Sequence, residues 1–218
     1  MLLRNWGKPT MTIYDLKPAF QNLLRPSCRA LANTGVTANQ VTMLALLVSF
    51  VVGALFALNP ATRWAALLIP IWLFLRMALN AIDGMLAREH NMQSALGGFL
   101  NELSDVAADA ALYLPFALVA GVSPTLVIVI VILSLLAEMA GVVSVQVGAS
   151  RRYDGPMGKS DRAFVFGLFG LLLGLGVDLG WWANAALLFV ALLITLTIYN
   201  RVTRGLQELA GGDDTQPN

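Results

Sequence analysis

Long, uncharged apolar segments are the feature that most constrains the fold of this chain. Residues 40–58 and 181–200 contain no Asp, Glu, Lys or Arg. Apolar segments of about 18 residues or more are typical of helices that cross a lipid bilayer. Only 12% of the residues are charged, whereas about 25% is usual in a soluble domain. We therefore predict an all-α membrane protein that forms one helical bundle, with no sizeable soluble domain beside it.

Six transmembrane helices are expected, and an N-terminal amphipathic interfacial helix precedes them. In residues 12–33, apolar side chains recur at helical spacing with Lys17, Arg25 and Arg29 between them, as in helices that lie in the membrane interface. We expect this helix to be interrupted near Pro26; the alternative is a cytosolic segment with no membrane role. The predicted spans are residues 40–58, 63–88, 95–120, 124–148, 162–178 and 181–202.

The distribution of Lys and Arg predicts the orientation in the membrane. With six spans both termini lie on one side, and the loops of the opposite side hold only Arg63. Basic residues concentrate in cytoplasmic loops, so we expect a bacterial inner-membrane protein with both termini in the cytoplasm. The predicted regions are an N-terminal segment (1–36), the transmembrane domain (37–205) and a disordered cytoplasmic tail (206–218). Twelve basic residues fall on the predicted cytoplasmic side: Arg4, Lys8, Lys17, Arg25, Arg29, Arg88, Arg151, Arg152, Lys159, Arg162, Arg201 and Arg204.

Ionisable residues inside the predicted spans gather in the second and third spans. At about 100° per residue, each of these two helices carries one polar stripe near its cytoplasmic end. A short turn joins the helices, so they are expected to be antiparallel neighbours whose stripes face each other across a cavity. Charged groups in membrane spans usually mark functional sites. The stripes comprise Arg76, Asn80, Asp83, Gly84 and Ala87 on one helix and Asn101, Glu102, Asp105 and Asp109 on the other.

Converging carboxylates in a poorly hydrated site repel one another unless a cation separates them. Oxygen ligands from Asp, Asn and Glu suit a hard ion such as Mg²⁺, Mn²⁺ or Ca²⁺. The alternative is a set of polar contacts that only pack the helices together. Small residues such as Gly97 and Gly98 leave room for a ligand, or for ordinary close helix packing. The candidate metal ligands are Asn80, Asp83, Asn101, Glu102, Asp105 and Asp109.

The segment NAIDGMLAREHNMQSALGGFLNELSD, residues 80–105, resembles the signature D-x2-D-G-x2-A-R-x8-G-x3-D-x3-D of the CDP-alcohol phosphatidyltransferase family. The segment that starts at Thr37 is similar to the family's T-P-N-x-[LIV]-T motif before the first span. The resemblance implies six spans, a metal-dependent site and frequent homodimers. The signature positions that match are Asp83, Gly84, Ala87, Arg88, Gly97 and Asp105.

Two signature positions depart from the family pattern. Asn80 and Asn101 stand where the family has its first and third aspartates, which with the other two hold a binuclear metal site. Asn oxygens can still ligate, so the site could hold one ion rather than two. Glu102 and Asp109 could restore the missing charge. The third alternative is a protein that has kept the fold and lost the activity.

The resemblance implies a transferase in which an alcohol displaces CMP from a CDP-linked lipid, usually CDP-diacylglycerol. It implies Asp105 as the general base and Mg²⁺ or Mn²⁺, one or two ions, as the cofactor. A non-catalytic CDP-lipid-binding or scaffolding protein is the alternative function. A small ion transporter is disfavoured because the charges cluster at one face, and nothing in the sequence indicates nucleic-acid binding. The implied nucleotide-binding residues are Asn80, Asp83, Gly84, Ala87, Arg88 and Gly97.

Basic residues between the fourth and fifth spans predict how the acceptor binds. Arg151, Arg152, Lys159 and Arg162 cluster there, around a segment that resembles the G-K-x-x-[RT] segment of family members with phosphorylated acceptors. We therefore expect a small, phosphorylated or otherwise anionic alcohol, such as glycerol 3-phosphate or an inositol phosphate. The alternative is that these charges only set the topology. Arg76 is expected to pair with Glu102, Asp109 or Glu138, or else to reach a phosphate.

Overall fold

The structure is a computed structural model that describes residues 13–213. This part of the chain contains seven α-helices, one short 3-10 helix and no strand, which confirms the all-α prediction. The elements are α1 (Ile13–Asn33), α2 (Ala38–Leu58), α3 (Arg63–Glu89), α4 (Ala95–Tyr113), η1 (Leu114–Leu118), α5 (Pro124–Gln146), α6 (Lys159–Gly174) and α7 (Trp181–Asp213).

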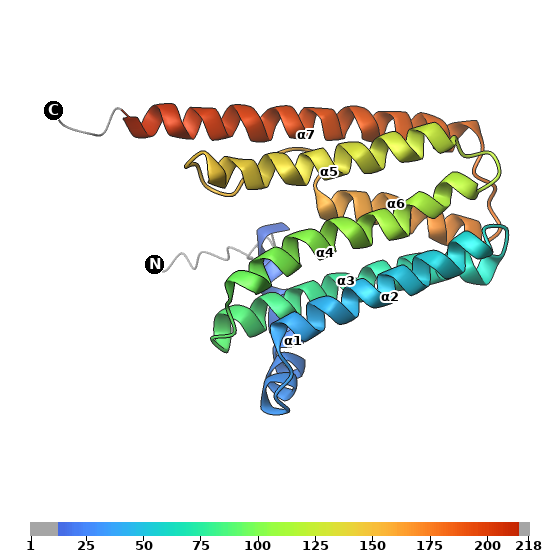
Figure 1. The fold of residues 1–218 in the computed structure, drawn as a ribbon. Helices are drawn as coiled ribbons and strands as arrows, with labels where there is room; N and C mark the ends of the chain where they lie inside the picture. The colour runs from blue at the N-terminus through green and yellow to red at the C-terminus, as the bar shows by residue number, and fades with distance from the viewer. Residues whose placement is uncertain (1–12, 214–218) are drawn as a thin grey trace, which may run out of the picture.

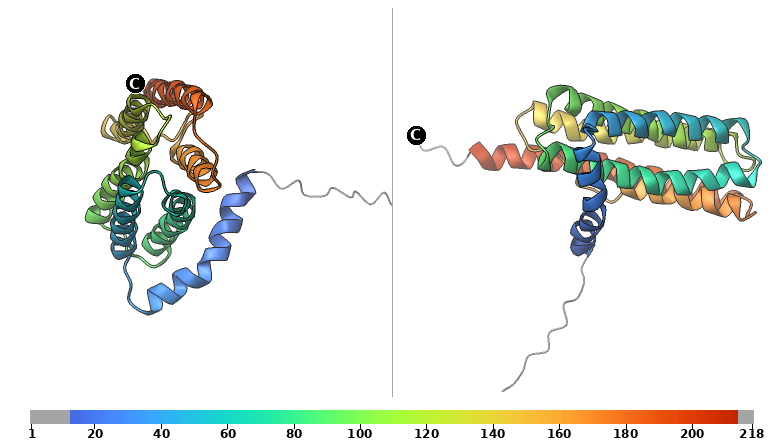
Figure 2. Two further views of the ribbon diagram at one scale, coloured as in Figure 1. Left: turned by 90° about the vertical axis from the view of Figure 1, so that its right-hand side faces the viewer. Right: turned by 90° about the horizontal axis from the view of Figure 1, so that it is seen from below.

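Helices α2 to α7 lie alongside one another in an elongated bundle, and α1 lies across one end of it (Figures 1 and 2). Helix α3 packs against α1, α2 and α6, while α4 packs against α2 and α5 packs against α7. The turn between α3 and α4 lies at the same end of the bundle as α1 (Figure 1). The second and third predicted spans are therefore antiparallel, and α2 packs against both of them. Helices α3 and α4 meet through polar side chains such as Arg76 and Asp109 rather than in close backbone contact.

Four helices in residues 13–213 are long and apolar enough to cross a membrane: α2, α3, α5 and α7. Helices α4 and α6 lie beside them in the bundle (Figure 1). However, α4 carries three carboxylates, and α6 has only 16 residues. The presence of six membrane spans therefore stays a prediction.

Aromatic side chains fill the interior of the bundle. The ring of Phe166 stacks on Tyr113 at 4.2 Å between centroids and meets Phe116 edge to face at 5.2 Å. Large apolar side chains such as Phe74 and Phe189 are exposed on the outside. An apolar exterior around a packed core is what a bundle surrounded by lipid requires.

Local capping contacts fix the helix starts beside the site. The Thr37 hydroxyl accepts a hydrogen bond from the Gln40 amide at 3.3 Å, and the Gln40 side chain accepts one from the Thr37 amide at 2.9 Å. This capping box satisfies amides that the first helical turn leaves without partners. At the start of α4 the Ser94 hydroxyl accepts from the Gly97 amide at 2.9 Å.

Helix α1 differs from the prediction because it continues through Pro26 without a break. A proline removes one backbone donor, and the helix bends along its length but is not interrupted (Figure 2, left). One face of α1 packs on α3, where Cys28 lies in an apolar cluster with Met85 and Leu86. Its interfacial location stays a prediction, and the side chains of residues 13–19 are outside those described.

Helix α7 also extends beyond its predicted end. It continues to Asp213, so residues 206–213 are helical rather than disordered, and residues 214–218 lie outside the described part. Contacts with the loop after α5 explain the extension. The Glu208 carboxylate accepts hydrogen bonds from the Ser150 amide at 3.1 Å and from the Arg152 guanidinium at 2.6 Å.

Candidate active site

A first cavity of about 500 Å³ opens between α2, α3 and α4. The polar side chains of Asn39 and Thr42 come from α2, and Asn101 comes from α4. The structure brings all the predicted nucleotide-binding residues to the lining of this one cavity. These are Asn80, Asp83, Gly84, Ala87, Arg88 and Gly97.

Two glycines in the first turn of α4 have different roles in this cavity. A Cβ atom at Gly97 would lie 2.8 Å from the Asn39 side-chain oxygen and 3.0 Å from the Ser94 hydroxyl. A side chain at this position would therefore displace the side chains of Asn39 and Ser94 from their places beside the start of α4. A Cβ at Gly98 would meet nothing within 4 Å, so Gly98 only leaves the cavity open.

Asp83 is a buried carboxylate on the wall of the first cavity. The Thr42 hydroxyl donates to its Oδ2 at 2.9 Å, and Asp83 takes part in none of the ion pairs found in residues 13–213. A buried carboxylate without a cation is costly. This environment favours a cationic ligand beside Asp83.

Asp105 holds three hydrogen-bond donors at one carboxylate oxygen. Its Oδ1 accepts from the Asn80 amide at 3.2 Å and from Arg76 Nη2 at 3.4 Å, and Lys159 Nζ forms an ion pair with the same oxygen. Arg76 Nη2 also donates to the Asp105 backbone oxygen at 2.9 Å. These contacts fix the side chain between α3, α4 and the start of α6.

A second cavity of about 350 Å³ lies on the other side of Asp105. Basic and aromatic groups from three distant segments line it: Arg151 and Tyr153 from the loop, Lys159 from α6, and Arg201 from α7. Asn101 lines both cavities, and Asp105 lines the second while bonding Asn80 of the first. The two cavities are therefore neighbours that meet at Asn101 and Asp105.

The structure divides the predicted acceptor-binding residues into two pairs. Arg151 and Lys159 line the second cavity. Arg152 instead turns to Asp154, at 2.9 Å, and to Glu208. Arg162 is fully buried in an ion-pair network and also lies outside the cavity lining.

Several cavity residues were not predicted from the sequence, among them Arg201 and Thr42. Arg201 lies at the predicted cytoplasmic end of the last span, where a basic residue also serves topology, so its charge alone gave no separate signal. Thr42 belongs to the segment that resembles the family's first motif, so this resemblance could have identified it.

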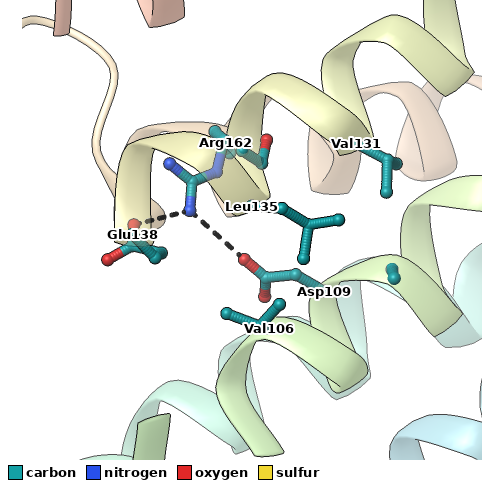
Figure 3. A pocket seen from close by; sticks show the side chains of 8 residues that line it. Val106, Asp109, Val131, Leu135, Glu138 and Arg162 are labelled. Atoms are coloured by element: carbon teal, nitrogen blue, oxygen red, sulfur yellow. Dashed lines mark hydrogen bonds and ion pairs between the residues drawn. The ribbon is translucent and has the colours of Figure 1, made fainter. Parts of the chain in front are cut away.

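A buried ion-pair network forms the floor beneath the second cavity. Asp109 pairs with Arg76 at 2.5 Å and with Arg162 at 3.5 Å. Arg162 also bonds Glu138 at 2.9 Å, and Figure 3 shows its guanidinium between the two carboxylates. Glu138 lies 3.3 Å from Arg201 as well. The network therefore joins α3, α4, α5, α6 and α7 at one level of the bundle.

Two candidate metal ligands are already neutralised by arginines. Asp109 belongs to the buried network, and Glu102 pairs with Arg151 at 2.7 Å. The set of candidate ligands therefore narrows to Asn80, Asp83, Asn101 and Asp105, of which Asp105 is itself paired with Arg76 and Lys159.

The narrowed ligand set fits one divalent ion better than two. No group of three or more His, Cys, Asp or Glu side chains in residues 13–213 is arranged to hold a metal. Two carboxylates and two amide oxygens are ligands that Mg²⁺ or Mn²⁺ accepts. Their charge of −2 balances one such ion, whereas a second ion would leave uncompensated positive charge in a poorly hydrated site.

Comparisons with known proteins identify a family with a similar sequence. The profile of the CDP-alcohol phosphatidyltransferase family matches residues 35–197. Inner membrane protein YnbA of Escherichia coli K12 is 45% identical over 88% of the chain and 94% of its own length. Archaetidylinositol phosphate synthase of Pyrococcus horikoshii is 30% identical over 47% of the chain and 52% of its own length.

Solved structures show the same fold. Phosphatidylinositol phosphate synthase PgsA1 of Mycobacterium tuberculosis with CDP-DAG bound has a TM-score of 0.66, at 18% identity, over 83% of this chain and 92% of that one. The same enzyme in complex with manganese and citrate has a TM-score of 0.68 at 18% identity, over 83% of this chain and 88% of that one.

Proposed function

The chain belongs to the CDP-alcohol phosphatidyltransferase family, and we propose that it transfers a phosphatidyl group from CDP-diacylglycerol, or a similar CDP-linked lipid, to a small alcohol. The observation that carries this proposal is the pair of cavities that meet at Asn101 and Asp105. A transferase with two substrates needs two adjacent sites with the reacting atoms at their junction. A solved structure of the same fold has CDP-DAG bound, which supports the choice of lipid donor.

The first cavity is proposed to bind the CDP group. Gly84, Ala87 and Gly97 leave room for the nucleotide, and Arg88 on the cavity wall can pair with a phosphate. Asn80, Asp83, Asn101 and Asp105 would hold Mg²⁺ or Mn²⁺ there. When bound, this ion supplies neutralisation of the pyrophosphate charge. The lipid chains stay in the bilayer while the headgroup occupies the cavity.

Asp105 is proposed as the general base. The acceptor hydroxyl attacks the phosphorus next to diacylglycerol, the bond from that phosphorus to the oxygen of CMP breaks, and CMP leaves with the electron pair. Asp105 takes the proton of the attacking hydroxyl. Arg76 and Asn80 hold the Asp105 carboxylate at the junction of the cavities, which is the position that this step requires.

The second cavity is proposed to bind an anionic acceptor, such as glycerol 3-phosphate or an inositol phosphate. Arg151, Lys159 and Arg201 line it. Carboxylates in the same lining already pair with both arginines: Arg151 with Glu102 and Glu138, and Arg201 with Glu138. A phosphate in the cavity would compete with these carboxylates for the guanidinium groups. The name of the 30% identical archaeal synthase also specifies an inositol phosphate product.

The location is proposed to be a bacterial inner membrane, with both termini and the site on the cytoplasmic side. The name of the 45% identical E. coli relative and the distribution of basic residues support this location. Six spans and a homodimer are proposed with it, as the family resemblance implies.

A non-catalytic CDP-lipid-binding protein is the second candidate, and Asn80 and Asn101 favour it because they remove two carboxylates from the signature. CMP release separates the two functions. The purified protein in nanodiscs is given CDP-diacylglycerol and Mg²⁺ or Mn²⁺, with glycerol 3-phosphate, inositol 1-phosphate, inositol, serine or glycerol. We expect CMP release with a phosphorylated acceptor and its loss in Asp105→Asn. Binding of CDP-diacylglycerol without CMP release from any acceptor would establish the second candidate.

A further inference from the structure

We propose that Lys159 is a positioning residue that couples the two cavities: an anion in the second cavity draws Lys159 away from Asp105, and this frees Asp105 for a divalent cation. Lys159 lines the second cavity and at the same time forms an ion pair with Asp105 at the junction. The anion would bind Lys159 and the cation would bind Asp105, so each ligand takes one partner of this ion pair. Binding of one ligand should therefore favour binding of the other. The inference rests on the proposed function because it assigns the cation and the anion to these cavities.

The charges around the junction disfavour a divalent cation as long as Lys159 stays in place. Asp109 balances Arg76, so the junction holds two negative charges, from Asp83 and Asp105, and one positive charge, from Lys159. A divalent cation beside Asp83 and Asp105 would then leave a net positive charge in a partly buried site, which is unfavourable. Either a positive side chain moves away or an anion enters with the metal.

Of the two positive side chains on Asp105, only Lys159 is able to leave. The Arg76 side chain is 4% exposed, and Asp109 holds it at 2.5 Å. The Lys159 side chain is 29% exposed and borders the open cavity. A lysine carries its charge on a flexible four-carbon stem, so its ammonium group can change partner without a change in the fold.

The backbone of Lys159 is fixed while its side chain is free to turn. Lys159 is the first residue of α6, and the Asp161 carboxylate accepts a hydrogen bond from the Gly158 amide at 2.9 Å. The helix start thus stays in place. An anion beside Arg151 and Arg201 would lie in the cavity that Lys159 already borders. The ammonium group would then exchange one anionic partner, Asp105, for another.

Binding of Mn²⁺ in the presence of sulfate tests this coupling directly, because linkage requires each ligand to raise the affinity of the other by the same factor. Sulfate serves as a doubly charged, tetrahedral probe. Full-length protein in phosphatidylcholine nanodiscs is titrated with Mn²⁺ in sodium sulfate and in sodium chloride of equal ionic strength. Free Mn²⁺ is measured by electron paramagnetic resonance and corrected for pairing with sulfate. We expect sulfate to strengthen Mn²⁺ binding by about tenfold, within the usual range of coupling between sites.

Substitutions at Lys159 separate this coupling from simple charge attraction. Lys159→Met should bind Mn²⁺ about tenfold more tightly in chloride and lose most of the sulfate effect. Lys159→Arg should keep both properties of the unmodified protein. Arg204→Met is the control, since Arg204 is exposed and pairs only with Asp154 in the described residues. Gel filtration and thermal unfolding of each variant verify that it is folded.

Two results would overturn the coupling. One is a Mn²⁺ affinity of the unmodified protein that is equal in sulfate and chloride. The other is a Lys159→Met variant that matches the unmodified protein in both salts. The CMP-release assay tests the transferase function independently of the Mn²⁺ titration. A coupled protein that releases no CMP would contradict the transferase function alone, and an active protein without coupling would contradict the role of Lys159 alone.

Discussion

Asn80 and Asn101 lie at the junction of the cavities and carry no charge where the signature of the family has aspartates. Two carboxylates and two amides balance one divalent ion, so the number of ions depends on these two positions. We expect Asn80→Asp combined with Asn101→Asp to raise the bound Mn²⁺ from one ion to two per chain. Plasma mass spectrometry after desalting measures this number. The matched control is Asn80→Ala with Asn101→Ala, which should bind less than one ion; a single ion in the aspartate variant would contradict the prediction.

Glu138 neutralises the buried guanidinium groups of Arg162 and Arg201. It receives Arg162 at 2.9 Å and Arg201 at 3.3 Å, and both guanidinium groups are almost fully buried. Removing one partner of a buried ion pair costs about 3–5 kcal/mol. We expect Glu138→Gln to lower the unfolding temperature strongly in detergent.

The control for Glu138→Gln is an ion pair at the surface. Arg25 and Glu89 lie 3.0 Å apart, and each side chain is 39% exposed. Exposed pairs of this kind contribute about 0–1 kcal/mol, so Glu89→Gln should leave the unfolding temperature almost unchanged. Equal losses in the two variants would show that the buried network does not stabilise the bundle.

Among the elements, the α3–α4 hairpin could be predicted most fully from sequence. Its polar stripes follow from the helical repeat, and the short turn makes the two helices antiparallel, so most of the lining of the first cavity could be predicted. The second cavity could not. Arg151, Lys159 and Arg201 come from a loop and two helices that meet only through tertiary packing. For the same reason the pairing of Glu102 with Arg151 could not be read from the sequence.

The contact between α2 and α4 depends on a glycine. A Cβ atom at Gly53 would collide with the backbone carbonyl of Ala111, which cannot move aside without shifting α4. We therefore expect Gly53→Ala to lower the unfolding temperature although alanine is the better helix former. Gly98→Ala is the matched control, because a Cβ at Gly98 meets nothing within 4 Å. Similar unfolding temperatures for the two variants would contradict this close contact.

The docking of α1 on α3 can be followed through Cys28. Its thiol is fully buried, and burial raises the pKa of the thiol. Less thiolate is therefore present near neutral pH, and a maleimide reagent should react slowly. The rate should rise only when the pH exceeds the usual range for a thiol.

A neighbouring position provides the comparison for Cys28. Ser27 is exposed, so a Ser27→Cys, Cys28→Ser variant should react with the maleimide many times faster at pH 7. The rates of maleimide labelling at the two positions are measured by mass spectrometry on the folded protein. Equal rates at the two positions would show that α1 does not stay docked on α3.

For the whole molecule, sequence reasoning located every helix of the bundle, but the number of membrane crossings depends on α4 and α6. If all six long helices cross, the loop before α5 lies outside and the loop before α6 lies inside. Counting only α2, α3, α5 and α7 as crossings would reverse both assignments, and it would conflict with Figure 1, where the loops before α3, α5 and α7 lie at one end of the bundle. Hydropathy alone cannot decide, because α4 and α6 carry their polar groups into ion pairs that form only in the folded bundle.

We expect the six-span arrangement, and labelling of single cysteines in intact cells tests it. In a Cys28→Ser background, Ala120→Cys should react with a membrane-impermeant maleimide from outside the cell. Pro156→Cys should react only after the cells are permeabilised. Both positions are exposed, so access to the reagent depends on the membrane alone. The opposite pattern would establish four spans.

The ion pair between Arg76 and Asp109 also has a consequence for how the chain enters the membrane. If α3 and α4 leave the insertion channel together as a hairpin, Arg76 of α3 and Asp109 of α4 enter the lipid as a neutral pair. Asp109 also bonds Arg162, which is synthesised later, at 3.5 Å. The pair with Arg76 therefore bridges the interval before α6 emerges. Asp109 is thus neutralised first by Arg76, which is synthesised before it, and later also by Arg162.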